Sequence, residues 1–344
     1  MNHRERVLRT LEFQPVDRVP YDLMEGTVWP ELMDYFREKH GLENEDRVLD
    51  FMDTDFRWIG MSYVGPPEHA PAEDLPDGWR TTYTDALFER PLVHARTVAD
   101  VEAYEWPRPE WWEPDDYAGF RDRWRDHAVV FFIGWKPLFC GACNVFGMEE
   151  ALVKMAAEQD LFEAFVKRQH AFCMALFERG LKAAQGHCDI CWLGDDYAGN
   201  DSMLMSPALW RRHIKPYLAE QVQLVRDYGM KVLFHSCGAV RAILPDLIEI
   251  GVDGLLVFQT SAAGMDPESI AREFGGRLGF YGGVDCQRLL TFGTPDEVRA
   301  EVRRNVRAFA QCGGYVVSNA HCHIANIRGE NIEAMIEAAR GCTF

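Results

Sequence analysis

Two short segments that contain histidine and cysteine are the residues best suited to bind a metal ion. The first is His-Ser-Cys-Gly at 235–238, which follows an apolar run and ends in a glycine that permits a tight turn. The second is Asn-Ala-His-Cys-His at 319–323. Zinc favours cysteine sulfur and histidine nitrogen, and a catalytic zinc site uses three protein ligands and leaves one position open. We therefore expect one Zn²⁺ held by His235, Cys237 and either His321 or Cys322.

The alternative for the first segment is purely structural, with His235 as a pocket histidine and Cys237 as a packed thiol. Two Cys-x-x-Cys pairs also compete for a metal, at 140/143 and 188/191. Their separation is longer than a compact zinc ribbon allows, and the second pair falls in a predicted strand, where odd spacing sends the two thiols to opposite faces. We therefore interpret these four as core or loop thiols and place the metal at His235.

Acidic, amide and aromatic side chains follow other apolar runs and complete the candidate site. Of the pair Asp195-Asp196, one carboxylate is expected to enter the pocket and the other to cap or turn the loop, and we assign the pocket role to Asp195. Glu25 suits a general base or a group that orients a metal ligand. The predicted catalytic residues are therefore Glu25 and Asp195, and the predicted substrate-binding residues are Asp22, Trp135, Gln259 and Asp285.

These residues need a scaffold that brings distant strand ends together, and the order of the predicted elements along the chain indicates such a scaffold. Short β-rich runs alternate with longer amphipathic segments, as expected of repeated βα units with a parallel sheet. In a parallel barrel the chemistry lies at the C-terminal ends of the strands. The predicted strands are Val129–Gly134, Cys188–Gly194, Lys231–His235, Gly254–Phe258, Leu278–Tyr281 and Tyr315–Asn319.

Helix signals separate these strands. Ser206-Pro207 predicts the start of a helix over Pro207–Tyr228 that Gly229 ends. Thr294-Pro295 opens a second helix, whose Val298, Val302, Val306 and Phe309 recur at helical spacing. An earlier unit is predicted from an extended run at Arg18–Asp22, a helix at Trp29–His40 and a strand at Asp55–Ile59. The sequence thus predicts one (β/α)₈ TIM barrel over 1–344, with an irregular excursion at Gly65–Trp112 that covers one end of it.

Composition limits the classes of partner. The 36 Lys and Arg residues against 54 Asp and Glu residues give a formal charge of -18. Such a surface repels nucleic acid and anionic lipid, and no stretch of apolar residues is long enough for a membrane span. Ten cysteines are compatible with thiols in a reducing compartment. We expect a soluble cytoplasmic protein that binds a small molecule, with a homodimer as one possible assembly.

Several motifs together resemble the uroporphyrinogen decarboxylase superfamily, and within it the zinc-dependent methyltransferases that work with corrinoid proteins. The resemblance covers nearly the whole chain. The motifs that carry it are Arg4 to Arg9 with Pro15 to Pro20, Ala103 to Pro107, Met205-Ser206-Pro207 with Trp210, His235 to Gly238, Tyr281 to Asp285, and Glu330-Asn331-Ile332.

The resemblance implies methyl transfer between a small molecule and the cobalt of a separate corrinoid protein. In that branch the His-x-Cys-Gly motif matches His235 and Cys237, and a late cysteine is the third zinc ligand. Counting back from Glu330 without a gap places His321 at the position of this third ligand. The ligand in that branch is a cysteine, however, which favours Cys322. We expect demethylation of a methyl ether or methylamine-like compound in preference to methylation of a thiol, because the expected pocket has acids and tryptophans but no evident basic clamp.

The decarboxylase branch carries an Arg-Gln-Ala-Gly-Arg loop after the first strand, which suits a substrate with many carboxylates. This chain has Tyr-Asp-Leu-Met-Glu-Gly at 21–26 instead, and its acids would repel such a substrate. Decarboxylation of a carboxylated ring is the alternative enzyme class. A noncatalytic barrel that binds a small molecule or a corrinoid protein is the third hypothesis.

Overall fold

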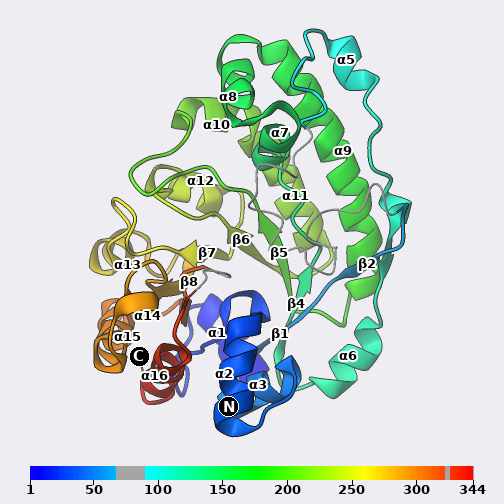
Figure 1. The fold of residues 1–344 in the computed structure, drawn as a ribbon. Coiled ribbons are helices and arrows are strands. Elements are labelled where there is room, and N and C mark those ends of the chain that lie inside the picture. The colour runs from blue at the N-terminus through cyan, green and yellow to red at the C-terminus, as the bar shows by residue number, and fades with distance from the viewer. Residues whose placement is uncertain (67–89, 322–325, 344) are drawn as a thin grey trace.

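The computed structural model describes residues 1–66, 90–321 and 326–343, and shows a curled parallel sheet surrounded by helices (Figure 1). The strands are β1 (Phe56–Ile59), β2 (Met61–Tyr63), β3 (Trp112–Pro114), β4 (Ala128–Phe132), β5 (Ile190–Gly194), β6 (Lys231–His235), β7 (Gly254–Phe258), β8 (Gly279–Val284) and β9 (Tyr315–Asn319). Seven of them form one parallel sheet in the order β1-β4-β5-β6-β7-β8-β9, and β2 and β3 form a separate antiparallel pair.

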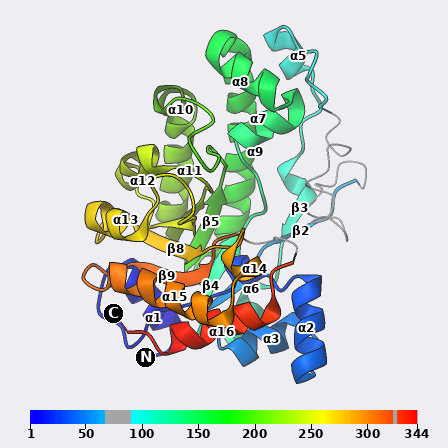
Figure 2. The ribbon, with the colours of Figure 1, turned by 60° about the vertical axis from the view of Figure 1, so that its left-hand side comes forward.

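The helices follow the strands in alternation and cover the outside of the sheet, as Figures 1 and 2 show. They are α1 (His3–Leu11), α2 (Pro30–His40), α3 (Glu45–Met52), α5 (Val98–Glu102), α6 (Tyr117–Arg123), α7 (Phe139–Phe146), α8 (Met148–Ala157), α9 (Gln159–Ala184), α10 (Pro207–His213), α11 (Lys215–Asp227), α12 (Leu244–Glu249), α13 (Pro267–Phe274), α14 (Leu289–Phe292), α15 (Pro295–Phe309) and α16 (Gly329–Arg340).

The extended run at Arg18–Asp22 closes the sheet into a barrel. Tyr21 forms a parallel bridge with Val317 of β9. The N–H of Val317 donates to the carbonyl of Pro20 at 2.9 Å, and the N–H of Asp55, just before β1, donates to the carbonyl of Tyr21 at 3.0 Å. This run therefore supplies the eighth strand position between β9 and β1, and the predicted (β/α)₈ barrel is confirmed.

One predicted helix is divided in the structure, and several predicted strands have other bounds, such as Val129–Gly134 against Ala128–Phe132 for β4 and Leu278–Tyr281 against Gly279–Val284 for β8. The helix predicted over Pro207–Tyr228 is two helices, α10 and α11, separated at Ile214. Pro216 explains the break, because it has no N–H to donate to the carbonyl of Arg212 and it suits the first turn of a new helix. The strand predicted from Cys188 begins only at Ile190.

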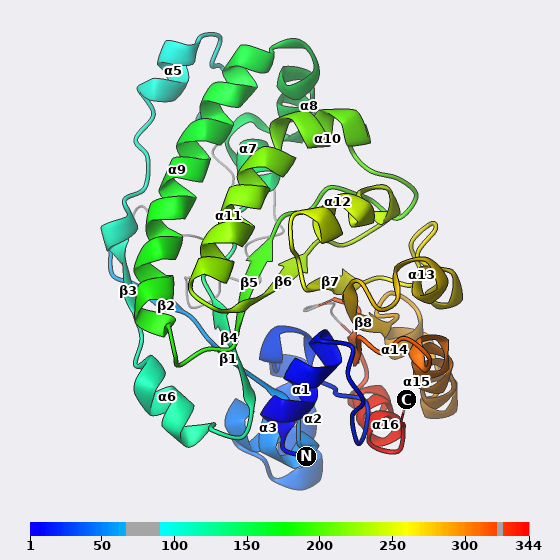
Figure 3. The same cartoon turned by 180° about the vertical axis from the view of Figure 1, so that it is seen from behind.

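The described part of the Gly65–Trp112 excursion lies along α9 on the outside of the barrel (Figure 3). The rings of Trp106 and Phe165 have centroids 5.3 Å apart, and those of Trp112 and Phe172 are 5.7 Å apart. The arginine side chain of Arg179, on α9, donates to the carbonyl of Trp112 at 3.0 Å. Residues 67–89 lie outside the described residues, so the prediction that this segment covers one end of the barrel stays a prediction.

A buried carboxylate joins the closing strand to its neighbour. Asp55 is completely buried and accepts hydrogen bonds from His3, Arg6 and both guanidinium NH groups of Arg18 at 2.6–3.0 Å, as well as from the N–H of Tyr21 at 2.9 Å. Burial alone would raise the pKa of Asp55, but the hydrogen bond from His3 and the charge of Arg18 outweigh burial and hold this pKa below its usual value. The ionised carboxylate therefore stabilises the closed barrel.

Among the helices in the described part of the chain, none is both long and apolar enough to cross a bilayer.

We predict that Asp55→Ala lowers the free energy of unfolding by about 3 kcal/mol, because it removes the buried partner of Arg6 and Arg18 and leaves them only the more exposed Asp17 and Asp53. Urea denaturation at neutral pH measures this loss. Since the pKa of Asp55 is lower in the folded than in the unfolded protein, its contribution is complete above the unfolded-state pKa and is lost as the pH falls through the folded-state pKa.

Asp53→Asn is the matched control, because the Asp53 side chain is 55% exposed and its contacts are long: ion pairs with His3 and Arg18 at 3.4 and 3.8 Å, and a hydrogen bond from the hydroxyl of Tyr21 at 3.5 Å. We expect it to change stability by less than about 1 kcal/mol. Equal losses for the two variants would contradict the role given to Asp55.

Candidate functional site

His235 ends β6 and is the centre of the candidate site. Its side chain is buried, and the ring lies edge-on to Trp135 and Trp192, with centroid separations of 5.4 and 5.6 Å. The Nδ1 atom lies 3.0 Å from Oε1 of Glu25. The ring of His321, which follows β9, has its centroid 6.1 Å away. The structure thus brings together four of the predicted site residues, Glu25, Trp135, His235 and His321, at the C-terminal ends of the strands.

Glu25 reaches His235 from an unusual backbone conformation. Its φ of 57° and ψ of 24° are left-handed, and Gly26 follows with a φ of 63°. A side chain on Gly26 would place its Cβ 2.4 Å from the indole of Trp58, so only glycine fits there. Asn319 supports this turn by accepting a hydrogen bond from the N–H of Met24 at 3.0 Å. A non-glycine residue held in this region costs about 1–3 kcal/mol and is often found at functional sites, which favours a functional role for Glu25.

The electrostatic surroundings of His235 are acidic. Burial lowers the pKa of His235, but the hydrogen bond to Glu25 and the negative charges of Asp196 and Glu25 outweigh it, so the pKa is raised overall. The Nε2 atom faces Asp196, with a separation of 3.7 Å from Oδ1. The site therefore favours positive charge at this imidazole, either as a proton or as a cation next to Nε2.

Cys237 lies on the same side as Asp196. Its N–H donates to Oδ1 of Asp196 at 2.9 Å. Burial and the neighbouring charge of Asp196 raise the pKa of the Cys237 thiol. Without a cation the thiol therefore keeps its proton, and a bound cation would favour the thiolate.

The two adjacent aspartates have different surroundings: Asp196 faces His235, and the catalytic role of Asp195 stays a prediction. Asp195, predicted to be catalytic, is buried and anchors the start of α7, since its oxygens accept from the N–H groups of Leu138, Phe139 and Cys140 at 2.7–3.0 Å. Burial raises its pKa to about 7. Asp196 is the carboxylate that faces His235 and Cys237. The sequence indicated that the pair would divide these roles, but gave no signal for which residue takes which.

Gln259 and Asp285 hold loops in the structure, and their substrate-binding roles stay predictions. The amide oxygen of Gln259 accepts from the N–H of Gly238 at 2.9 Å, and its NH₂ group donates to Asn200 at 2.7 Å. The carboxylate of Asp285 accepts from the N–H groups of Gln287, Arg288 and Leu289 at 3.1–3.3 Å, at the start of α14. Gln259 therefore positions the metal-binding segment predicted at 235–238, and Asp285 stabilises a turn.

Asp22 points into the barrel. Its Oδ2 atom accepts from the indole N–H of Trp58 at 2.9 Å and from the hydroxyl of Tyr281 at 2.8 Å. The carboxyl is completely buried, and this burial raises its pKa to about 7. Its substrate-binding role stays a prediction.

Two of the predicted zinc ligands, His235 and Cys237, lie among the described residues. His235 and Cys237 are donors of the types that zinc prefers, and Glu25 fixes the ring through the nitrogen that a metal would not use. Among residues 1–66, 90–321 and 326–343, no three His, Cys, Asp or Glu side chains close around one point. Cys322, one of the two predicted late ligands, lies outside the described residues. The Cys140, Cys143, Cys188 and Cys191 thiols form no disulfides, and Cys188 lies before β5 rather than within it.

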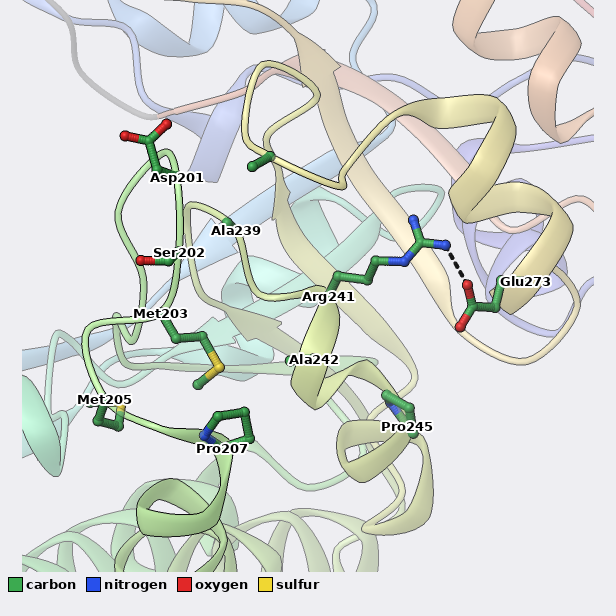
Figure 4. Close-up of a pocket in the computed structure, with 11 residues that line it drawn as sticks. Asp201, Ser202, Met203, Met205, Pro207, Ala239, Arg241, Ala242, Pro245 and Glu273 are labelled. Carbon is green, nitrogen blue, oxygen red and sulfur yellow. Dashed lines mark hydrogen bonds and ion pairs between the residues drawn. The ribbon is translucent and has the colours of Figure 1, made fainter.

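A separate open cavity of about 620 Å³ lies beside this site (Figure 4). The loop between β5 and α10 lines it with Met203 and Met205, and the segment after Gly238 lines it with Ala239 and Arg241. The guanidinium group of Arg241 is paired with Glu273 on α13. This cavity has none of the residues that contact His235, so it is not the candidate metal site.

Comparisons with known proteins agree with this fold. A family model described as uroporphyrinogen decarboxylase (URO-D) matches residues 139–342. The methylcobamide:CoM methyltransferase MtaA of Methanosarcina barkeri is 28% identical over 169 residues, which are 49% of this chain and 44% of that protein. Uroporphyrinogen decarboxylase of Thermus thermophilus is 26% identical over 157 residues, which are 45% of this chain and 42% of that protein. The chain thus aligns with less than half the length of these relatives.

A solved structure described as a methyltransferase from Methanosarcina mazei superposes with a TM-score of 0.66 and covers 99% of both chains. Its sequence identity is 18%. This likeness shows that the fold extends over the whole chain.

We predict that Gly238→Ala displaces the segment after His235 and lowers the free energy of unfolding by about 2 kcal/mol or more. Gly238 has a φ of +83°, and an added Cβ would lie 2.6 Å from the carbonyl oxygen of Gly199 and 2.8 Å from that of Ala198. The left-handed backbone alone costs about 1–2 kcal/mol for alanine. Chemical denaturation measures the loss.

Gly199→Ala is the control, since nothing lies within 4 Å of its added Cβ. It should leave stability nearly unchanged. A Gly238→Ala protein as stable as the Gly199→Ala protein would show that this segment is not held as described.

Proposed function

The chain belongs to the uroporphyrinogen decarboxylase (URO-D) family, and we propose that it is a zinc-dependent methyltransferase that moves a methyl group between a small molecule and a separate corrinoid protein. The observation that carries the proposal is the pair Glu25–His235, a carboxylate bonded to the Nδ1 atom of a histidine whose Nε2 atom faces Asp196 and lies near a cysteine. Metal-binding histidines commonly use their second nitrogen in this way. The similarity to a methylcobamide:CoM methyltransferase supports the same assignment.

His235 and Cys237 would hold the zinc, together with His321 or Cys322. Zinc in such a site lowers the pKa of a bound thiol or water, or polarises an oxygen that carries a methyl group. Glu25 accepts a hydrogen bond from the Nδ1–H of His235, which leaves the lone pair of Nε2 available to bind the metal. Gln259 holds the N–H of Gly238 at 2.9 Å and so fixes the exit of the segment that contains both ligands.

The small molecule is proposed to be a methyl ether or a methylamine-like compound. The described side chains around His235 are the carboxylates of Glu25 and Asp196 and the rings of Trp135, Trp192 and His321. Carboxylates at this distance disfavour a substrate with an anionic group, such as a sulfonated thiol. Aromatic walls suit a planar or cationic compound.

Decarboxylation of a carboxylated ring is the second candidate, because the family model and the Thermus relative both carry that name. The acidic turn at 21–26 argues against it, since Asp22 and Glu25 would face a polycarboxylate. Release of carbon dioxide from a porphyrinogen by metal-free protein would favour this candidate over methyl transfer.

We predict that His235→Ala lowers the zinc content of the purified full chain from one ion per chain to near zero. We also predict that it abolishes methyl transfer from methylcobalamin to a panel of thiols, and methyl transfer from a panel of methyl ethers and methylamines to cob(I)alamin. Metal analysis measures the first effect, and the absorbance change on interconversion of cob(I)alamin and methylcobalamin measures the second. The physical reason is that the imidazole supplies one of three protein ligands.

His187→Ala is the control, because His187 lies before β5, at the opposite end of that strand from Asp195 and Asp196. It should keep both zinc and activity. Full zinc stoichiometry and full methyl transfer in the His235→Ala protein would show that the proposed function is wrong.

A further inference from the structure

The side-chain amide of Asn319 joins two segments of the candidate site that are far apart in the sequence. Asn319 is the last residue of β9 and is completely buried. Its Oδ1 atom accepts the N–H of Met24 at 3.0 Å, in the turn that carries Glu25. Its Nδ2 atom donates to the carbonyl of His321 at 2.7 Å. One amide is therefore bonded to the Glu25 turn through its oxygen and to the segment at residue 321 through its nitrogen.

Both of these segments face the ring of His235. Glu25 lies 3.0 Å from the Nδ1 atom of that ring. The ring of His321 stands edge-on to it, with a centroid separation of 6.1 Å and an interplanar angle of 82°. We propose that Asn319 is a positioning residue, which sets the places of Glu25 and His321 around His235 at the same time. This inference rests on the proposed function, because Asn319 would act through a residue that binds the metal.

An amide suits this position because it carries an acceptor and a donor on one short side chain. The Glu25 turn presents a backbone N–H, and the segment at residue 321 presents a backbone carbonyl. Other contacts act on one segment alone and are longer. The Cys286 thiol lies 3.7 Å from the carbonyl of His321, and the hydroxyl of Tyr281 donates to the carbonyl of Leu23 at 3.3 Å. Asn319 therefore provides a short bond to each segment.

The ring nitrogens of His235 report the place of Glu25 in the metal-free full chain. When Glu25 accepts from Nδ1, the neutral ring keeps its proton there, and without this bond the proton divides between the two nitrogens. We expect nitrogen-15 NMR at an alkaline pH, where the ring is neutral, to show the Nδ1–H form in the wild type and a mixture of both forms in Asn319→Ala. Spectra of His235→Ala identify the signals by their absence.

Asn305→Ala is the matched control. Asn305 is also completely buried, but its Nδ2 atom donates to the carbonyl of Gly283 at 2.9 Å. This variant removes a buried amide of the same size and should keep the wild-type signals of His235.

Asn319→Asp separates the two hydrogen bonds and keeps the size of the side chain. Its carboxylate still accepts from the N–H of Met24 but offers no donor to the carbonyl of His321. The His235 signals should therefore stay in the Nδ1–H form, whereas the ring signals of His321 should change. This variant also tests the inference if Asn319→Ala does not fold.

Methyl transfer provides a second kind of measurement. Loss of a partner that orients a metal ligand costs about 10–100-fold in activity, so Asn319→Ala should lower kcat by that factor and change KM less. In a Glu25→Ala background the same change should cost little more, because residues that act through one contact are not additive.

Unchanged His235 signals in Asn319→Ala, or an equal change in Asn305→Ala, would overturn this inference and leave the proposed function standing. If the wild-type chain has neither zinc nor methyl transfer, the proposed function fails. The NMR comparison then still decides whether Asn319 positions Glu25 beside His235.

Discussion

The contact between Glu25 and His235 is the interaction on which the candidate site depends. It joins a turn after the first strand position to the end of β6, 210 residues further along the chain, through a 3.0 Å hydrogen bond. The barrel makes this contact possible, because closure between Tyr21 and Val317 brings the first and last strands together and Asn319 then holds the turn that carries Glu25. The same bond fixes the imidazole, so that Nε2 faces Asp196.

Much of the fold could be predicted from local sequence patterns. The apolar runs at Lys231–His235, Gly254–Phe258 and Tyr315–Asn319 correspond residue by residue to β6, β7 and β9, because buried parallel strands are marked by continuous apolar residues. The single helix predicted after Ser206 was wrong because the amphipathic pattern continues through Pro216, whereas the backbone hydrogen bonds cannot. The spacing of apolar residues thus reports burial more reliably than it reports helix continuity.

The candidate site was predictable in position but not in the division of roles. Their position after predicted strands identified Glu25, Asp195, Gln259 and Asp285 together with His235. Three of them, Asp195, Gln259 and Asp285, accept hydrogen bonds from backbone N–H groups of loops. Which of Asp195 and Asp196 enters the site depends on the start of α7, more than fifty residues earlier in the sequence, whose N–H groups need an acceptor. The left-handed backbone of Glu25 likewise could not be predicted from the neighbouring residues, apart from the glycine that follows it.

The central claim is that one zinc ion lies between His235 and Cys237. The most direct measurement is anomalous diffraction at the zinc edge from crystals of the full chain purified with its own metal. We predict a single strong peak about 2.0–2.3 Å from Nε2 of His235 and from Sγ of Cys237. Crystals that contain stoichiometric zinc with the peak elsewhere, or that retain no zinc at all, would contradict it.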